Sequence, residues 1–181
     1  DFIDRGNKQK ETLNIVRAMV DSGTALAVMG NHEYNAITYY FGVREHTESN
    51  RNAHIAFLDA YENDPYNYKE IVEWFMALPL WLDLEGLRVI HACWDPVLVD
   101  KVSKELKGGI LNHDFMLKSA EKQNWEYESI ETLLKGKEIP LKEGFSFKDK
   151  DEKTRHHIRV RWWDKSATTY KSAFMGPEDA R

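Results

Sequence analysis

Cysteine is nearly absent from this chain, since Cys93 is the only one in 181 residues. A disulfide within the chain is therefore excluded, which fits a reducing compartment, and we expect a cytoplasmic protein. No apolar run approaches the roughly 20 residues that a membrane-spanning helix needs, so we expect no membrane partner. The formal net charge of −5 at pH 7 leaves no basic excess that would attract nucleic acid.

Aromatic residues, in contrast, are plentiful, with 8 Phe, 8 Tyr and 6 Trp. Together with 42% hydrophobic residues, they indicate a folded chain rather than a disordered one. A length of 181 residues is typical of one domain with one compact core. The chain begins with Asp1 rather than Met, so a signal peptide can be neither recognised nor excluded.

Apolar spacing near the start predicts a helix and then a strand. Apolar residues recur at helical spacing within residues 7–22, and Gly23 follows as a stop. Residues 25–29 are a short apolar run that ends at Gly30. Such a run is typical of a buried parallel strand in a sheet that helices cover on both faces.

The rest of the chain predicts a helical cap over residues 34–78, further helices and two hairpins. The turn of the first hairpin is Glu85-Gly86, and its second strand delivers His91 to a strand end. In the last strand, alternation puts Ile158 and Val160 on one face and the neighbouring arginines on the other. The predicted elements are, in order, helices near 35–41, 52–61 and 68–77, a hairpin of 81–84 and 87–91, helices with breaks from 95 to 135, and a hairpin of 145–147 and 156–163 across the charged turn 148–153.

Chemically useful side chains gather in two loops and at one strand end. Residues 1–6 place two carboxylates, a guanidinium and a glycine before a helix, a loop that suits a hard metal ion and a phosphate. Residues 30–33, Gly-Asn-His-Glu, follow the predicted buried strand. Catalytic groups of open α/β sheets gather at the carboxyl ends of strands, so we expect both loops and His91 to face one crevice.

In order and residue type, these motifs resemble the calcineurin-like metallophosphoesterases, and within them the branch of serine/threonine protein phosphatases and symmetrical diadenosine tetraphosphatases. The matching motifs are Asp-x-x-Asp-Arg-Gly, Gly-Asn-His-Glu and a strand that ends in His, and they reach to about Trp94. The resemblance implies an α/β fold of packed mixed β-sheets flanked by helices. It also implies a single partial domain over residues 1–181 that lacks the first and last strands of the family.

The resemblance further implies two divalent metal ions, Mn, Fe or Zn, with Asp1 bridging both and Asn31 and His91 binding one of them. Oxygen and nitrogen ligands of this kind suit these metals, and paired cations activate a water for attack on phosphorus. By the same resemblance, His32 protonates the leaving oxygen, while Asp4 holds its ring and raises its pKa.

Phosphate binding is expected from Arg5, which can form a charge-assisted fork, and from Asn31. The resemblance extends less specifically to Arg159 and Arg161. The alternative interpretation of these two arginines is that they form the solvent-exposed face of an edge strand. Side chains to which we assign no chemical role are Cys93, Trp162 and Trp163, which are expected to pack, and His46, His54 and His113, which lie in polar segments.

Two ligand motifs of the family have no counterpart here, namely an upstream Asp-x-His and a downstream Gly-His. His156 and His157 are the only late histidines and lack the expected glycine. Whether the segment alone is active therefore stays open. The expected substrate is a phosphorylated partner, either a phosphoprotein for a serine/threonine-phosphatase-like enzyme or a nucleotide for a symmetrical dinucleoside tetraphosphate hydrolase. The alternative of another class is a degenerate domain that binds phosphate or a partner without catalysis.

Overall fold

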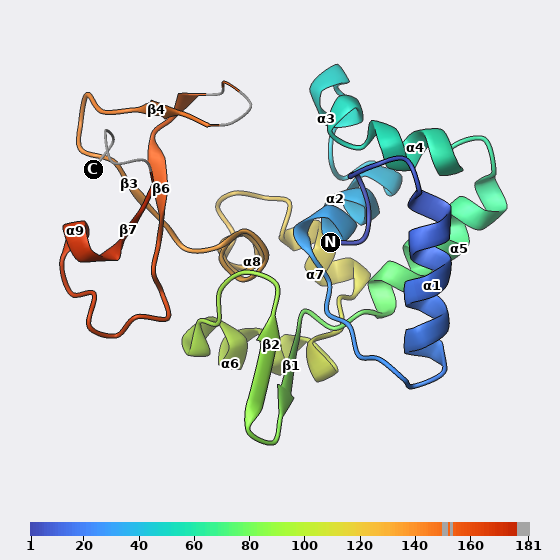
Figure 1. Ribbon diagram of the computed structural model, residues 1–181, viewed down its shortest axis with the longest axis horizontal. Coiled ribbons are helices and arrows are strands. Elements are labelled where there is room, and N and C mark those ends of the chain that lie inside the picture. Colours follow the sequence, from blue (N-terminus) through green and yellow to red (C-terminus); the bar gives the residue numbers. More distant parts are fainter. Residues whose placement is uncertain (150–151, 153, 177–181) are drawn as a thin grey trace.

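The computed structural model describes residues 1–149, 152 and 154–176, with helices and several small sheets, in agreement with the predicted α/β class (Figure 1). The α-helices are α1 (Gln9–Asp21), α2 (Asn31–Tyr40), α3 (Glu48–Ala53), α4 (Ile55–Tyr61), α5 (Pro65–Ala77), α6 (Pro96–Glu105), α7 (His113–Lys118), α8 (Trp125–Ile130) and α9 (Tyr170–Ala173). The strands are β1 (Trp81–Leu84), β2 (Leu87–Ile90), β3 (Glu138–Pro140), β4 (Phe147–Lys148), β5 (Thr154–Arg155), β6 (His157–Val160) and β7 (Phe174–Met175). Two short helical turns are η1 (Lys107–Gly109) and η2 (Glu131–Lys135).

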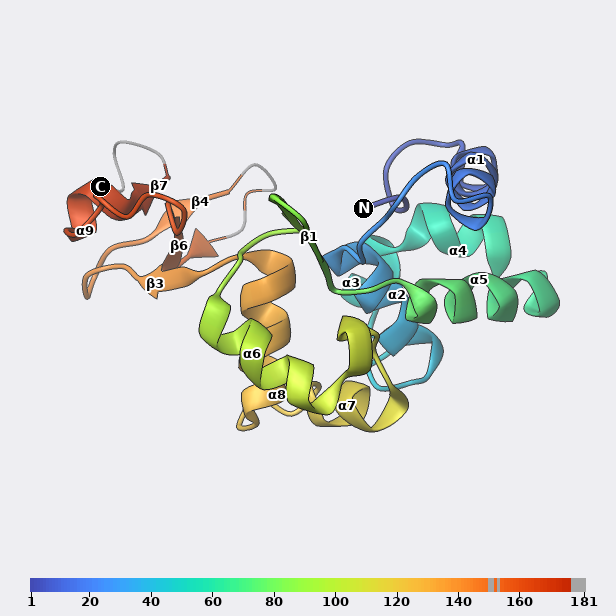
Figure 2. The ribbon, with the colours of Figure 1, turned by 90° about the horizontal axis from the view of Figure 1, so that it is seen from below.

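The elements form one group at each end of the longest axis of the molecule and a third group between them. Helices α1 to α5 lie at one end, and the small sheets of β3 to β7 lie at the other (Figures 1 and 2). The hairpin of β1 and β2 and helices α6 to α8 lie between them. The chain start lies beside α2, so the first loop and the start of α2 are neighbours in space (Figure 1).

Several predicted elements are confirmed. Where a helix begins at another residue than predicted, a capping residue at its start explains the difference. Helix α1 and the hairpin of β1 and β2 lie where the spacing predicted them. Helix α5 begins at Pro65, before the predicted residue 68, because the side chain of Asp64 accepts a hydrogen bond from the backbone N–H of Asn67. An Asp cap followed by Pro in the first turn is a strong helix start.

The helix predicted over residues 52–61 is in fact two helices that meet at His54. Thr47 caps α3 by accepting from the backbone N–H of Asn50 at 3.2 Å, so this helix begins earlier than predicted. His54 then leaves helical geometry, with φ −118° and ψ 11°, and α4 follows. The break turns the His54 side chain into the interior, where it is 2% exposed.

The predicted parallel strand at residues 25–29 is wrong, because these residues form no strand. The backbone N–H of Met29 donates to the carbonyl of Pro79 at 2.8 Å, but no ladder extends from that bond. All strand pairs among the described residues are antiparallel. A buried apolar run becomes a strand only where a neighbouring strand satisfies its backbone groups, and local sequence does not supply one.

The second predicted hairpin is also wrong in its pairing. Strand β6 pairs with β3 and β7 rather than with residues 145–147, while β4 pairs with β5. Ile158 and Val160 do face the interior, as the alternation predicted, and Ile158 packs with Leu141 and Phe174 in a small second core. Phe147 packs against this core from β4 without pairing with β6. Residues 150, 151 and 153 of the predicted turn lie outside the described residues.

The main core holds α2 in place from both sides. Ile37 on α2 and Phe57 on α4 are fully buried in it, as is Phe75 on α5. The hydroxyl groups of Tyr34 and Ser119 form a buried hydrogen bond of 2.7 Å, which ties α2 to the end of α7. The position of α2 is therefore fixed by the core and by the end of α7. Within the described residues, no helix is both long and apolar enough to cross a bilayer.

Candidate active site

The first loop of the chain is clamped by Gln9, the first residue of α1. The Gln9 side chain, on a residue that is 4% exposed, accepts from the backbone N–H of Asp4 and donates to the carbonyls of Arg5 and Gly6, each at 3.0 Å. Asp4 has φ +70°, a left-handed conformation that Asp tolerates better than most residues. The clamp thus fixes the backbone that presents the Asp4 carboxylate.

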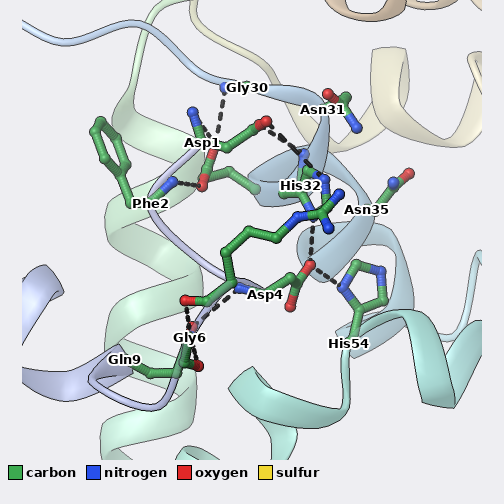
Figure 3. Close-up of polar contacts among 12 residues, drawn as sticks. Asp1, Phe2, Asp4, Gly6, Gln9, Gly30, Asn31, His32, Asn35 and His54 are labelled. Carbon is green, nitrogen blue, oxygen red and sulfur yellow. Dashed lines mark hydrogen bonds and ion pairs between the residues drawn. The ribbon is translucent and has the colours of Figure 1, made fainter. Parts of the chain in front are cut away.

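Glu33 joins this loop to the start of α2. Its buried carboxylate accepts from the backbone N–H of Phe2 at 2.6 Å and from that of Gly30 at 2.9 Å (Figure 3). Two loops that are about thirty residues apart are thereby held together. A Cβ atom on Gly30 would overlap Oδ1 of Asp1, so the lack of a side chain there is what allows the close approach.

Asp1, Asn31 and His91 converge, as the sequence predicted. Nε2 of His91 lies 3.0 Å from Oδ1 of Asn31 and 3.4 Å from Oδ2 of Asp1. The other Asp1 oxygen accepts the backbone N–H of His32 at 3.2 Å, in the first turn of α2. A carboxylate at a helix N-terminus is stabilised by the helix dipole. Because the backbone N–H of His32 holds Oδ1 of Asp1 there, Oδ2 is left to approach His91.

Asp4 binds two imidazoles through one oxygen. Its Oδ2 accepts from Nδ1 of His32 at 2.7 Å and from Nδ1 of His54 at 2.6 Å (Figure 3). Burial alone would raise the pKa of Asp4, but the hydrogen bonds and charges of His32 and His54 outweigh burial and lower this pKa below its usual 3.8. An ionised carboxylate only accepts, so both Nδ1 atoms carry protons.

With Nδ1 committed to Asp4, the other ring nitrogen of His32 faces the converging side chains. Nε2 of His32 lies 4.0 Å from Oδ2 of Asp1. The His32 side chain is 20% exposed, so a substrate can reach this nitrogen. Burial lowers the pKa of the neighbouring His91, and the positive charge of Arg159 lowers it further.

The predicted phosphate-binding arginines differ in where they lie. Arg5 is exposed, and its backbone is held by Gln9. The Arg159 side chain passes over Gly136, where a Cβ would lie 3.7 Å from its Cδ and Nε, and its charge acts on His91. Arg161 follows the end of β6 and lines a shallow hollow with Trp163, Asp164 and Met175. Arg159 therefore lies over Gly136 at the end of η2, while Arg161 lies in the hollow with Trp163, and the phosphate-binding role of both arginines stays a prediction.

The side chains present fit one divalent cation. Within the described part of the chain, no group of three or more His, Cys, Asp or Glu side chains is arranged to hold a metal ion, so a site here depends on the amide of Asn31 as a third donor. Carboxylate, amide oxygen and imidazole are donors that Mn, Fe and Zn accept. Cys93 is buried and burial raises the pKa of its thiol, so it does not offer a reactive thiolate beside His91.

Three residues that carry this geometry were missed in the sequence. Gln9 and Glu33 lie next to or within the motifs, but their hydrogen bonds are to backbone groups that the sequence does not bring together. His54 was taken to have no role, because its partner Asp4 is 50 residues away. No local pattern around His54 marks it.

Comparison with known proteins gives a family match. The model of the family described as calcineurin-like phosphoesterase matches residues 1–180, which is nearly the whole chain. No curated protein and no solved structure matches the chain.

Proposed function

Because this chain belongs to the calcineurin-like phosphoesterase family, whose chemistry is metal-dependent hydrolysis of phosphoesters, we propose that it acts on phosphoproteins in the manner of a serine/threonine protein phosphatase. Hydrolysis of a phosphoester is supported by one observation, the pairing of His32 with Asp4, while the choice of a phosphoprotein substrate rests on the resemblance of the motifs alone. This pairing leaves Nε2 of His32 facing Asp1, Asn31 and His91. A proton donor beside a potential metal site is the arrangement that cleavage of a phosphoester needs.

The proposed general acid is His32, which gives the proton on Nε2 to the leaving oxygen of the substrate. Asp4 accepts from Nδ1, so it fixes the orientation of the ring and keeps the proton on that nitrogen. When the bond from phosphorus to the serine oxygen breaks, the serine side chain leaves as an alkoxide unless that oxygen is protonated, so a donor of this kind increases turnover by about two to four orders of magnitude.

Asp1, Asn31 and His91 are the side chains that would hold metal. We propose that the protein uses two divalent ions, Mn, Fe or Zn, and that these three side chains would hold one of them. Bound metal would supply Lewis-acid chemistry, polarising the phosphate and activating a water for attack on phosphorus. The imidazole of His91 would help to orient the other two side chains, since its Nε2 lies 3.0 Å from Oδ1 of Asn31 and 3.4 Å from Oδ2 of Asp1.

Arg5, Asn31 and Arg159 are the proposed contacts for the phosphate oxygens. Arg5 is exposed at the loop that carries Asp4, and Arg159 lies within electrostatic range of His91. A guanidinium can bind two oxygens of a phosphate at once. Cys93, buried and free, supports the further proposal of a reducing, cytoplasmic location.

The test is turnover of a phosphoserine peptide by the full-length protein with Mn²⁺, compared with release of ADP from diadenosine tetraphosphate. We expect the peptide to be the better substrate. H32A should lower kcat by about two orders of magnitude or more, and N31A should lower it similarly by weakening metal binding, while both keep the fold. Preference for the tetraphosphate would replace the substrate assignment, and no turnover of either with intact metal binding would favour a non-catalytic phosphate-binding domain.

A further inference from the structure

His54 is a buried histidine whose side chain makes a single hydrogen bond to the described residues. Its side chain is 2% exposed, its Nδ1 donates to Oδ2 of Asp4, and its Nε2 is buried with no hydrogen-bond partner among the described residues. Oδ1 of Asp4 is likewise buried without a partner. Leaving a buried polar atom unsatisfied is unfavourable, so an imidazole at this position needs a compensating role.

The geometry indicates what that role is. The rings of His32 and His54 meet the same carboxylate oxygen at a steep angle, with ring centroids 6.5 Å apart and planes inclined by 84° (Figure 3). One hydrogen bond from His32 alone would let the Asp4 carboxylate rotate about its terminal bond. A second donor from a different direction fixes Oδ2 in space.

The backbone around the two residues supports the same interpretation. Asp4 lies on a loop whose backbone is held by Gln9, whereas His54 lies at the break between α3 and α4. Helix α4 is anchored in the core through Phe57. The Asp4 carboxylate is thus held between its own loop and the helical segment 48–61, independently of His32.

We infer that His54 is a positioning residue for the general acid: it fixes the Asp4 carboxylate so that Nδ1 of His32 is bound in one orientation and Nε2 faces the metal-binding side chains. This rests on the proposed function, since it deepens the role of His32 there. His54 itself does not touch the substrate. Its effect reaches the reaction through Asp4 and then His32.

Two amide substitutions separate this role from simple packing. In H54N the side-chain amide can donate from about the position of Nδ1, whereas in H54Q it donates from about the position of Nε2 and leaves Asp4 without its second donor. We expect H54N to keep kcat within about threefold, and H54Q to lower kcat by about tenfold at an unchanged KM. H113Q, at an exposed histidine that contacts Phe41, is the matched control and should behave as the unmodified protein.

A measurement without turnover accompanies these variants. In the metal-free, full-length protein, proton NMR should show two strongly downfield Nδ1–H signals, from His32 and His54, that D4A removes together. In H54Q the His32 signal should shift or broaden, and in H54N it should stay. This comparison of spectra tests the role of His54 even if the phosphatase assay shows no activity at all. Absence of activity would contradict the proposed function, and it would not contradict the role of His54.

Two results would overturn the role of His54. The first is a spectrum of the unmodified protein with a single downfield Nδ1–H signal, which does not require any His54 variant to fold. The second is an equal loss of kcat in H54N and H54Q with an unmoved His32 signal, which means that position 54 acts by packing alone.

Discussion

Gly30 leaves empty the space that Oδ1 of Asp1 approaches, because a Cβ atom at position 30 would overlap that oxygen. The same Cβ would lie 2.7 Å from Oε2 of Glu33, whose carboxylate joins the two loops. Gly30 has φ −97°, which any residue can adopt, so crowding rather than backbone strain explains the glycine. Position 30 therefore permits the meeting of the first loop with α2.

G30A should displace Asp1 and weaken the site. We expect kcat/KM to fall by at least about tenfold and Mn²⁺ affinity to fall with it, measured by phosphatase assay and metal titration. The control is G86A, at the turn of the first hairpin, where φ is +77° and nothing lies within 4 Å of the added Cβ. That change should cost about 1–2 kcal/mol of stability through strain and leave turnover unaffected. Normal metal affinity in G30A would contradict the crowding argument.

Q9L should loosen the first loop. The change removes three hydrogen bonds and leaves the N–H of Asp4 and two carbonyls without that partner. The expected loss of unfolding free energy is about 1–3 kcal/mol, measured by urea denaturation. Q9E, which keeps the acceptor for Asp4 but places a buried carboxylate against the two carbonyls, should lose at least as much unfolding free energy as Q9L. A loss below about 0.5 kcal/mol for Q9L would show that water replaces the clamp.

D4N should change how stability depends on pH. The folded pKa of Asp4 is lower than its usual 3.8, so folding favours the ionised form. That contribution is complete above pH 3.8 and is lost as the pH falls through the folded pKa. At pH 7 we expect D4N to be about 1–3 kcal/mol less stable than the unmodified protein.

The difference between D4N and the unmodified protein should narrow in denaturant titrations below pH 3.8. D100N, at an exposed carboxylate that pairs with Lys104, is the control and should follow the unmodified protein at each pH. A stability difference for D4N that stays constant from pH 7 to pH 3 would mean that the two histidines do not favour the ionised carboxylate.

Substitution of the two C-terminal arginines should give different results. Arg159 acts electrostatically on His91, whereas Arg161 lies beside Asp164 and Trp163. R159A should raise KM for a phosphopeptide by about tenfold, because a charge-assisted contact to phosphate is lost. R161A should change KM by no more than about twofold, because the Arg161 side chain lies in the hollow with Asp164 and Trp163. Equal effects of both substitutions in steady-state assays would place the phosphate elsewhere.

The sequence predicted the site better than the sheets around it. Asp1, Asn31 and His91 meet as expected, and His32 contacts Asp4, because the order and residue types of the motifs are those of the family. Their metal and catalytic roles stay predictions. The strand-end argument held only for His91, which follows β2, since the described residues before α2 include no strand. The strand at 25–29 and the pairing of residues 145–147 failed, since a periodic pattern fixes which face of a segment is buried but not which segment pairs with it.

The burial of His54 and its contact with Asp4 could not be predicted from local sequence either. Its burial follows from the break between α3 and α4, and its partner comes from the far end of a loop that Gln9 shapes. Local propensity favoured one continuous helix there. Only the tertiary contact of His54 with Asp4 reveals that the break has a use.

The short distance between His91 and Asn31 joins positions that are 60 residues apart in the chain. An ion held by both, and by Asp1, would act as a non-covalent cross-link between three separate segments. Ligands that bind only the folded state stabilise it by mass action, by about 2.7 kcal/mol when the free ion is a hundredfold above its dissociation constant. The melting temperature of this protein would then report the free metal concentration, so a chelator would lower thermal stability as well as turnover.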